Sequence, residues 1–400
     1  MKNILLIMPY GSVGGMERLA LNFYNHYKEK GYKVKAIKII QLSSDIIHFN
    51  NDEIALSTLD FNEMSFIKRF WFYVKIPFLI RKIIKKNKIS HSIAFGDMAN
   101  VFSSLTFTKE FKIASIHALK SVEFVNKNFL NTVFKMGFKT SYYFFNKVVC
   151  ISEAIKKDVL ENCGYKFKNN LQVIYNPHNV KQINDLASLK IESIDESSIF
   201  NNDVILFLGR MSAQKAPWHL IKSFSLLENS NNKIKLVLIG DGDKAITDYL
   251  YKLVDKLKIS ENVIFLGRKS NPYQYLKRAK ILALTSYYEG TPNVIVEAIA
   301  TQTPIVSSNC TDGILELMSV SQSTTIENCI ETEAGIITPN FFKGTLSIPK
   351  DDAITTEEIT FAKALQRVLE NKKYKSNIVN NNTILLEKFN LEKIAQQYLK

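Results

Sequence analysis

Short apolar runs recur along the chain and alternate with segments whose apolar residues repeat at helical spacing. The sequence opens with such a run at residues 2–8, a glycine-rich turn, and a helical pattern at 17–30. Further runs predict strands at residues 33–40, 92–95, 113–116, 148–151, 204–208, 235–239, 262–265, 281–284 and 304–307. Strands separated by helices favour parallel sheets, so we expect an α/β fold.

The strand pattern is interrupted once, and the interruption divides the chain in two. Residues 180–203 are polar and poor in strands, which is typical of a linker. We therefore predict an N-terminal domain at residues 1–180 and a C-terminal domain at 181–385, both Rossmann-like. The last segment, residues 386–400, is predicted to be a helix that packs back on the N-terminal domain.

The net charge of +14 is concentrated in the first half of the chain. Residues 1–180 hold 26 Lys and Arg against 13 Asp and Glu, whereas residues 181–400 hold 26 against 25. One basic half and one nearly neutral half indicate two domains with different partners.

The sequence has neither a spanning segment nor a cysteine framework. No stretch of about 18 apolar residues is free of charges, and the apolar N-terminus is too short for a signal peptide. The four cysteines are scattered without metal-ligand spacing, at Cys150, Cys163, Cys310 and Cys329. We therefore expect a cytoplasmic protein with free thiols and no metal site.

A predicted strand–turn–helix joint carries two glutamates. Glu289 lies in the turn, and Glu297 lies about one helical turn into a helix predicted to start near Asn293. The free N–H groups of a helix N-terminus suit a diphosphate, and carboxylates accept hydrogen bonds from sugar hydroxyls. This arrangement fits a nucleotide sugar. The alternative is an ordinary strand–helix joint with two solvated glutamates.

A second loop follows the predicted strand at 204–208 and carries Arg210 and Lys215. Gly209 permits a tight turn, and ligands of open α/β sheets bind at the carboxyl ends of the strands. An Arg offers a planar fork to phosphate oxygens, and a Lys offers a point charge. The pair is suited to neutralising a departing diphosphate. The alternative is two surface cations.

Taken together, these motifs resemble the family-4 retaining glycosyltransferases. The resemblance rests on GR(x)4K at 209–215, GDG at 240–242, FLGR at 265–268, E(x)7E at 289–297 and the TPIVSS strand that follows. It extends over essentially the whole chain, through the glycine pair Gly14–Gly15, CISE at 150–153 and VIYNP at 173–177. The resemblance implies the GT-B fold, with two facing Rossmann-like domains and a nucleotide-sugar cleft between them.

The resemblance also implies a role for each matching residue. Arg210 and Lys215 would bind the donor diphosphate and stabilise the leaving group. Glu297 would hydrogen-bond the ribose, and Glu289 would meet the hydroxyls of the donor sugar. His117 would lie near the reacting sugar, although a lone histidine is more often structural. The other donor-binding positions implied are Gly290, Thr291, Asn293, Val294, Gly14, Gly15 and Arg268.

The implied activity is transfer of a hexose or N-acetylhexosamine with retention of configuration, with no cofactor. UDP is the expected nucleotide because it is commoner among such relatives. Nothing in the sequence resembles a DxD metal site, and Arg210 and Lys215 would supply the charge that a divalent ion supplies elsewhere. Because no nucleophilic carboxylate is assignable, we expect a front-face reaction in which the leaving phosphate assists the acceptor hydroxyl.

Residues 66–88 form a basic, aromatic segment with eight cations and no acid. Pro77 is expected to kink or split a helix here. Four lysines would fall within about 40° of one another on that helix: Lys68, Lys75, Lys82 and Lys86. Such a helix suits an anionic membrane surface, and the alternative is a buried helix with a solvated lysine edge. We therefore expect a peripheral enzyme at the inner face of the cell membrane. Its acceptor would be a polyprenyl-diphosphate-linked glycan in lipid-linked oligosaccharide or surface polysaccharide synthesis.

Three other interpretations stay open. A nucleotide-sugar epimerase shares the two-domain architecture and would consume a donor without an acceptor. A nucleic-acid-binding protein would use the basic half, but its cations are interleaved with large aliphatic residues and no recognition motif is present. A catalytically inactive sugar-nucleotide-binding partner is the third. Two segments depart from the family pattern: residues 319–352 are longer than usual, and Asn176-Pro-His-Asn replaces the usual asparagine–glycine hinge sequence.

Overall fold

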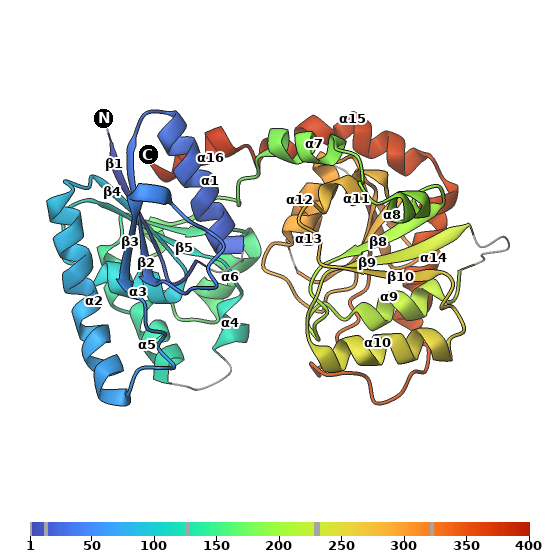
Figure 1. Ribbon diagram of the computed structural model, residues 1–400, viewed down its shortest axis with the longest axis horizontal. Helices are drawn as coiled ribbons and strands as arrows, with labels where there is room; N and C mark the ends of the chain where they lie inside the picture. Colours follow the sequence, from blue (N-terminus) through green and yellow to red (C-terminus); the bar gives the residue numbers. More distant parts are fainter. Residues whose placement is uncertain (1, 12–14, 125–128, 228–232, 312, 321–323) are drawn as a thin grey trace. The chain divides into compact units, whose positions relative to one another are not determined.

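The computed structural model describes residues 2–11, 15–124, 129–227, 233–311, 313–320 and 324–400. The chain forms two compact units: unit 1 comprises residues 1–178 and 388–400, and unit 2 comprises residues 179–387. Figure 1 shows the elements of both units, coloured along the sequence. Each unit has its own sheet and core, so the predicted α/β class is confirmed.

Among the described residues, unit 1 is built on a parallel sheet with the strand order β3-β2-β1-β4-β5-β6-β7. Alternate residues of β1 (Asn3–Met8) pack on opposite faces: Ile4 and Leu6 join one core, and Leu5 and Ile7 join another. Burial on both faces explains why this strand is a continuous apolar run. The other strands are β2 (Lys33–Ile40), β3 (Glu53–Ser57), β4 (His91–Phe95), β5 (Phe111–Ile116), β6 (Lys147–Cys150) and β7 (Leu171–Val173).

Helices lie on both sides of this sheet (Figure 1). The longest is α2 (Phe66–Lys86), which runs through Pro77 as one helix, so the expected split is wrong. Pro77 lies on the buried face of α2 together with Ile80 and Ile84. The other helices are α1 (Gly15–Glu29), α3 (Asp97–Ser104), α4 (Lys120–Glu123), α5 (Phe129–Gly137), α6 (Glu153–Glu161) and α16 (Leu391–Tyr398).

The C-terminal segment contains a helix end and a new helix rather than the single helix expected over 386–400. Helix α15 ends at Glu387, and the side chain of Asn390 caps α16 by accepting from the N–H of Lys393. Helix α16 packs on α1 within unit 1, where the Tyr27 hydroxyl donates to the carbonyl of Ala395 at 2.9 Å. The Asn390 cap therefore starts a separate helix after α15 has ended.

Unit 2 contains, among the described residues, a sheet with the order β10-β9-β8-β11-β12-β15-β14-β13. Its strands are β8 (Asp203–Leu208), β9 (Ile234–Ile239), β10 (Val263–Gly267), β11 (Ile281–Leu284), β12 (Ile305–Ser308), β13 (Thr324–Ile326), β14 (Cys329–Thr332) and β15 (Gly335–Thr338). Its helices are α7 (Val180–Ser188), α8 (Ile194–Ile199), α9 (Pro217–Phe224), α10 (Lys244–Lys256), α11 (Tyr273–Arg278), α12 (Asn293–Ala300), α13 (Ile314–Met318), α14 (Thr356–Glu370) and α15 (Lys373–Glu387).

Residues 180–203 are not a linker. They contain α7 and α8, and α7 packs against α11 and α12 of unit 2. Glu196 of α8 accepts from Lys269 at 2.6 Å and from the Tyr275 hydroxyl at 2.5 Å. The segment is polar because these helices lie on the surface of unit 2, so a lack of strands did not indicate a lack of structure.

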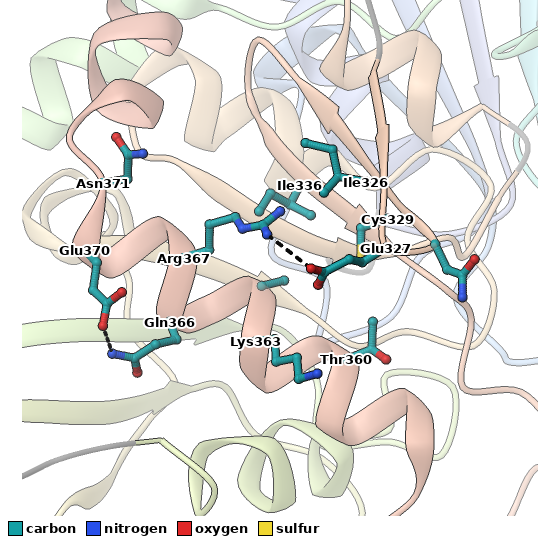
Figure 2. A pocket seen from close by; sticks show the side chains of 12 residues that line it. Ile326, Glu327, Cys329, Ile336, Thr360, Lys363, Gln366, Arg367, Glu370 and Asn371 are labelled. Atoms are coloured by element: carbon teal, nitrogen blue, oxygen red, sulfur yellow. Dashed lines mark hydrogen bonds and ion pairs between the residues drawn. The ribbon is translucent and has the colours of Figure 1, made fainter.

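The unusually long stretch after Ser319 adds an antiparallel hairpin to the parallel sheet. Strand β14 pairs with β15, and β13 forms the sheet edge. A cavity of about 700 Å³ lies between this hairpin and α14, lined by Glu327, Lys363 and Arg367 among others (Figure 2). Arg367 lies 3.8 Å from Glu327 across this cavity. None of the predicted site residues lines it.

Candidate active site

In unit 2, the loops that follow β8 and β9 pack backbone against backbone. Gly240 has φ +147°, and a Cβ there would lie 1.8 Å from the carbonyl oxygen of Gly209. A Cβ on Gly242 would lie 2.3 Å from the carbonyl oxygen of Met211. Only glycine fits both positions. The GDG motif therefore holds the loop that carries Arg210 in place.

Lys215 and Glu289 are 74 residues apart in the sequence and in contact in the structure. Lys215 Nζ lies 2.5 Å from Glu289 Oε1, and both side chains are largely buried. The Ser286 hydroxyl donates to the same oxygen at 2.8 Å. Strands β8 and β11 are neighbours in the parallel sheet, so the loops at their carboxyl ends lie side by side. The contact therefore lies at the edge where ligands of such sheets bind.

Further hydrogen bonds hold these two loops together. The Thr285 hydroxyl donates to the carbonyl of Lys215 at 3.1 Å, and the Gln214 amide donates to the carbonyl of Tyr288 at 2.9 Å. The N–H of Tyr287 donates to the carbonyl of Gln214 at 2.8 Å. No motif indicates Thr285 or Gln214, because their contacts depend on which strands are neighbours.

Helix α12 begins at Asn293, as the E(x)7E motif predicts. Pro292 is its N-cap and no side chain caps its N–H groups. The Asn293 Oδ1 is buried and has no hydrogen-bond partner among the described residues. Glu297 is 9% exposed, and the Tyr273 hydroxyl lies 3.5 Å from its carboxylate. Of the other predicted positions, Val294 is buried, and Gly290 and Thr291 are half-buried. The helix thus presents N–H groups beside the Glu289 loop.

The two predicted donor-binding arginines are less enclosed. Arg210 is exposed and makes no ion pair within the described part of the chain. Arg268 follows β10 and lies 4.0 Å from the exposed carboxylate of Asp241. Because β9 separates β10 from β8, the structure does not bring Arg268 into the contact between Lys215 and Glu289.

A buried network behind the Glu289 loop has no sequence signal. His219 Nδ1 lies 2.7 Å from Glu358 Oε1, and its Nε2 lies 3.0 Å from the Tyr287 hydroxyl. The ring stacks on Phe341 with a centroid distance of 4.4 Å. Burial lowers the pKa of His219, against the opposing effect of Glu358. The network connects α9 and α14 to a residue two positions before Glu289. His219 and Glu358 are 139 residues apart, so no local pattern could relate them.

In unit 1, His117 follows β5, and its ring packs on Phe95 with a centroid distance of 6.2 Å. Its Nε2 is buried and has no hydrogen-bond partner among the described residues. Burial, and to a smaller extent the charge of Lys120, lowers the pKa of His117 to about 3. The imidazole is therefore neutral at physiological pH. Lys120 is itself buried and pairs with Asp97 at 2.9 Å and with Glu123 at 2.5 Å.

The remaining predicted positions of unit 1 are the glycine pair and the lysines of α2. Gly14 lies outside the described residues, and Gly15 is the exposed first residue of α1. The exposed side of α2 carries the lysine stripe, which consists of Lys68, Lys75, Lys82 and Lys86.

No helix in the described part of the chain combines the length and apolar character that crossing a membrane requires. Among the same residues, no three His, Cys, Asp or Glu side chains are grouped to hold a metal ion.

Comparisons with known proteins match successive parts of the chain. A family model described as Glycosyltransferase Family 4 matches residues 13–182, and one described as Glycosyl transferases group 1 matches residues 190–329. An uncharacterized glycosyltransferase of Methanocaldococcus jannaschii is 25% identical over 353 residues, which is 84% of this chain and 86% of that protein.

A second relative is named for its acceptor. It is a Campylobacter jejuni α-1,4-N-acetyl-D-galactosaminyltransferase, named for a GalNAc-GalNAc-diNAcBac acceptor glycan on diphospho-undecaprenol. It is 24% identical over 407 residues, which is 100% of this chain and 98% of that protein. Among solved structures, HepE of Anabaena in complex with UDP has a TM-score of 0.76 at 18% identity, covering 99% of this chain and 98% of that chain.

The two Rossmann-like sheets and their helices are thus those of a GT-B glycosyltransferase. With both of its units matched by family models, the chain belongs to the group 1, family 4 glycosyltransferases, which retain the anomeric configuration. This membership makes the chain a glycosyltransferase rather than an epimerase.

Proposed function

We propose that this enzyme transfers a hexose or N-acetylhexosamine from a UDP-sugar to a glycan linked to polyprenyl diphosphate at a membrane surface. The contact between Lys215 and Glu289, beside the N-terminus of α12, carries the donor half of the proposal. The UDP complex of the Anabaena relative supports the nucleotide. The Campylobacter relative supports the acceptor. Capsule and O-antigen glycosyltransferases of Staphylococcus aureus and Escherichia coli, at 26% and 24% identity, support a role in surface polysaccharide synthesis.

In this proposal, cations and helix N–H groups bind the diphosphate. Glu289 Oε1 holds Lys215 in place, and its other carboxylate oxygen accepts from a hydroxyl of the donor sugar. Arg210 has no ion-pair partner among the described residues and binds the phosphates bidentately. The N–H groups of residues 290–294 face the sugar and phosphates, and Glu297 accepts from the ribose. Arg268 is a further phosphate contact.

The reaction proceeds on one face of the donor sugar. The bond between the anomeric carbon and the β-phosphate oxygen breaks while the acceptor oxygen bonds to that carbon from the same side. The acceptor proton moves to the leaving phosphate oxygen. Arg210 and Lys215 stabilise the charge that develops on UDP, and one such preorganised group contributes about 3–4 kcal/mol. Orientation of the two substrates contributes roughly 7–11 kcal/mol.

The roles of His117 and the glycine pair are proposed from the family pattern. The buried Nε2 of His117, neutral and without a partner among the described residues, is suited to one hydrogen bond with the reacting sugar. Gly15 starts α1 and places an N–H group at a helix N-terminus.

We also propose that the enzyme is cytoplasmic and binds the inner face of the cell membrane. There the lysine stripe would meet anionic lipid headgroups or the acceptor diphosphate.

The test is a binding panel followed by a transfer assay. We expect UDP and one UDP-sugar to raise the melting temperature, GDP to leave it unchanged, and Mg²⁺ to add nothing. That UDP-sugar should then glycosylate a polyprenyl-diphosphate-linked glycan with retention. Stabilisation by GDP instead of UDP would contradict the donor, and transfer only to a free sugar would contradict the acceptor.

A further inference from the structure

The helix α2 presents large apolar side chains to solvent along most of its length. Its buried face consists of Ile76, Pro77, Ile80 and Ile84. On the other side, Ile67, Trp71, Val74 and Phe78 are exposed, with 56% of Trp71 and 68% of Phe78 accessible. At 100° per residue these four fall within about 60° of one another. They form one continuous apolar ridge, which is named here the α2 ridge.

The lysine stripe runs directly beside the α2 ridge. Lys68, Lys75, Lys82 and Lys86 are all exposed, and their mean direction lies about 70° further round the helix. Within the described part of the chain, none of these lysines forms an ion pair. The helix has no acidic residue. A water-exposed surface that combines a ridge of this kind with unpaired cations is unusual for a monomeric protein.

We infer that α2 is a membrane anchor that lies in the plane of an anionic bilayer. The α2 ridge enters the boundary between headgroups and acyl chains, and the lysine stripe contacts anionic headgroups beside it. The anionic bilayer is thus the partner of α2. Only the purpose of the anchor, which is to bring the enzyme to a lipid-linked acceptor, rests on the proposed function.

Charge and side-chain chemistry favour lipid over the other occupants. A second copy of this chain would place two α2 helices together, each with seven cations and no acid, so the pair would repel. A diphosphate alone would pair with one or two lysines and would leave the α2 ridge exposed. A bilayer that contains anionic lipid buries the α2 ridge and at the same time provides headgroup charges for the lysines.

The chain contains a built-in probe of this contact. It has two tryptophans, and Trp218 is fully buried in unit 2. A change in tryptophan emission on vesicle binding therefore reports Trp71. With vesicles that contain phosphatidylglycerol, we expect a saturable blue shift and co-sedimentation of the full chain. Vesicles of phosphatidylcholine alone should bind at least about tenfold more weakly.

Three variants separate the contribution of the α2 ridge to vesicle binding from that of the lysine stripe. Ile67→Ser/Phe78→Ser removes apolar area and keeps every charge, and Lys68→Glu/Lys75→Glu/Lys82→Glu removes the cations and keeps the ridge. Each should lower the affinity for anionic vesicles at least about tenfold. The matched control reverses three exposed lysines of unit 2, namely Lys244, Lys252 and Lys350, and should bind vesicles as the wild type does.

Four results would overturn the inference. Three concern binding and oligomeric state: wild-type vesicle binding by either α2 variant, an equal loss of vesicle binding in the unit 2 control, and a concentration-dependent dimer that the α2 variants abolish. UDP-sugar binding is measured on the same samples. An α2 variant that still binds UDP but no longer binds vesicles supports the anchor. Absence of UDP binding by the wild type would refute the proposed donor and leave the anchor intact. The fourth result concerns the lysine variant. If it loses transfer to a soluble short-chain diphosphate acceptor while its vesicle binding stays intact, the lysines bind the acceptor and the anchor is rejected.

Discussion

His219 Nε2 lies 3.0 Å from the hydroxyl of Tyr287, two residues before the carboxylate that holds Lys215. This bond joins the core of unit 2 to the proposed donor loop. Removing the hydroxyl with Tyr287→Phe costs one buried hydrogen bond, about 0.5–1.5 kcal/mol. Because the loss falls on the Glu289 loop, we expect UDP-sugar affinity to fall by about 2–10-fold in calorimetric titration. Tyr249→Phe removes a different tyrosine hydrogen bond of unit 2, the one to Asp352, and leaves the bond of Tyr287 intact, so it should lower stability without changing this affinity. Equal affinity of both variants would show that His219 has no positioning role.

Arg210 is exposed and carries a charge that the proposed mechanism uses on the leaving group. Arg210→Ala should lower kcat about 10²–10³-fold, because one preorganised charge stabiliser is lost. The melting temperature should stay near that of the wild type, since the side chain forms no ion pair among the described residues. Lys244→Ala removes another exposed cation of unit 2 as the control and should turn over normally. Wild-type turnover by Arg210→Ala would remove the basis of the mechanism.

Gly240 and Gly267 both have positive φ but differ in the space around them. A Cβ on Gly240 would lie 1.8 Å from the Gly209 carbonyl oxygen, whereas nothing lies within 4 Å of a Cβ on Gly267. Gly267→Ala should therefore cost only about 1–2 kcal/mol, from its backbone conformation. Gly240→Ala must also displace the loop before Arg210, and we expect a larger loss of stability together with loss of UDP binding. The comparison uses denaturant unfolding and a UDP thermal shift, and similar results for both variants would contradict the packing argument.

The imidazole of His117, whose Nε2 is buried, predicts a pH-dependent stability. Its folded pKa of about 3 lies below the ordinary histidine pKa of 6.5, so the unfolded chain takes up this proton first as the pH falls. The contribution of His117 is therefore complete above pH 6.5 and is lost progressively as the pH falls towards 3. At pH 5 the loss is about 2 kcal/mol.

The measurement compares urea unfolding of the wild type and His117→Gln at pH of about 7.5 and 5. The wild type should lose about 2 kcal/mol more than the variant between these conditions. His26, His91 and His219, whose pKa values are also lowered, are present in both proteins and cancel. An identical pH dependence of the two proteins would show that His117 is accessible to protons in the folded state.

Tyr398 connects the C-terminal helix to unit 1. Its side chain is fully buried, its ring centroid lies 4.8 Å from that of Phe23, and its hydroxyl lies 3.1 Å from that of Ser115. Tyr398→Ala should lower the free energy of unfolding by about 3–5 kcal/mol. Tyr251→Ala, at a half-exposed position of unit 2, should cost much less. A small effect of Tyr398→Ala would mean that α16 is not required for the stability of unit 1.

Local patterns in the sequence predicted the central strands of both sheets but missed the short strands β3, β7, β13, β14 and β15. The strands at 33–40 and 281–284 have the predicted bounds, and α12 starts at the predicted Asn293. These elements are recognisable because a strand buried on both faces is a continuous apolar run, and a helix begins where a turn residue precedes it. The glycines of the GDG motif are local as well, since the backbone conformation at Gly240 suits no other residue.

Long-range packing decided which distant residues come into contact at the candidate site. Lys215 reaches Glu289, and His219 reaches Glu358, because the order of the strands brings distant loops and helices together, and no short-range periodicity encodes that order. The exposed side of α2 is a similar case. The sequence by itself determined that this helix is basic and apolar, but only its packing against the sheet, through Ile76, Ile80 and Ile84, decided which apolar residues remain in contact with solvent.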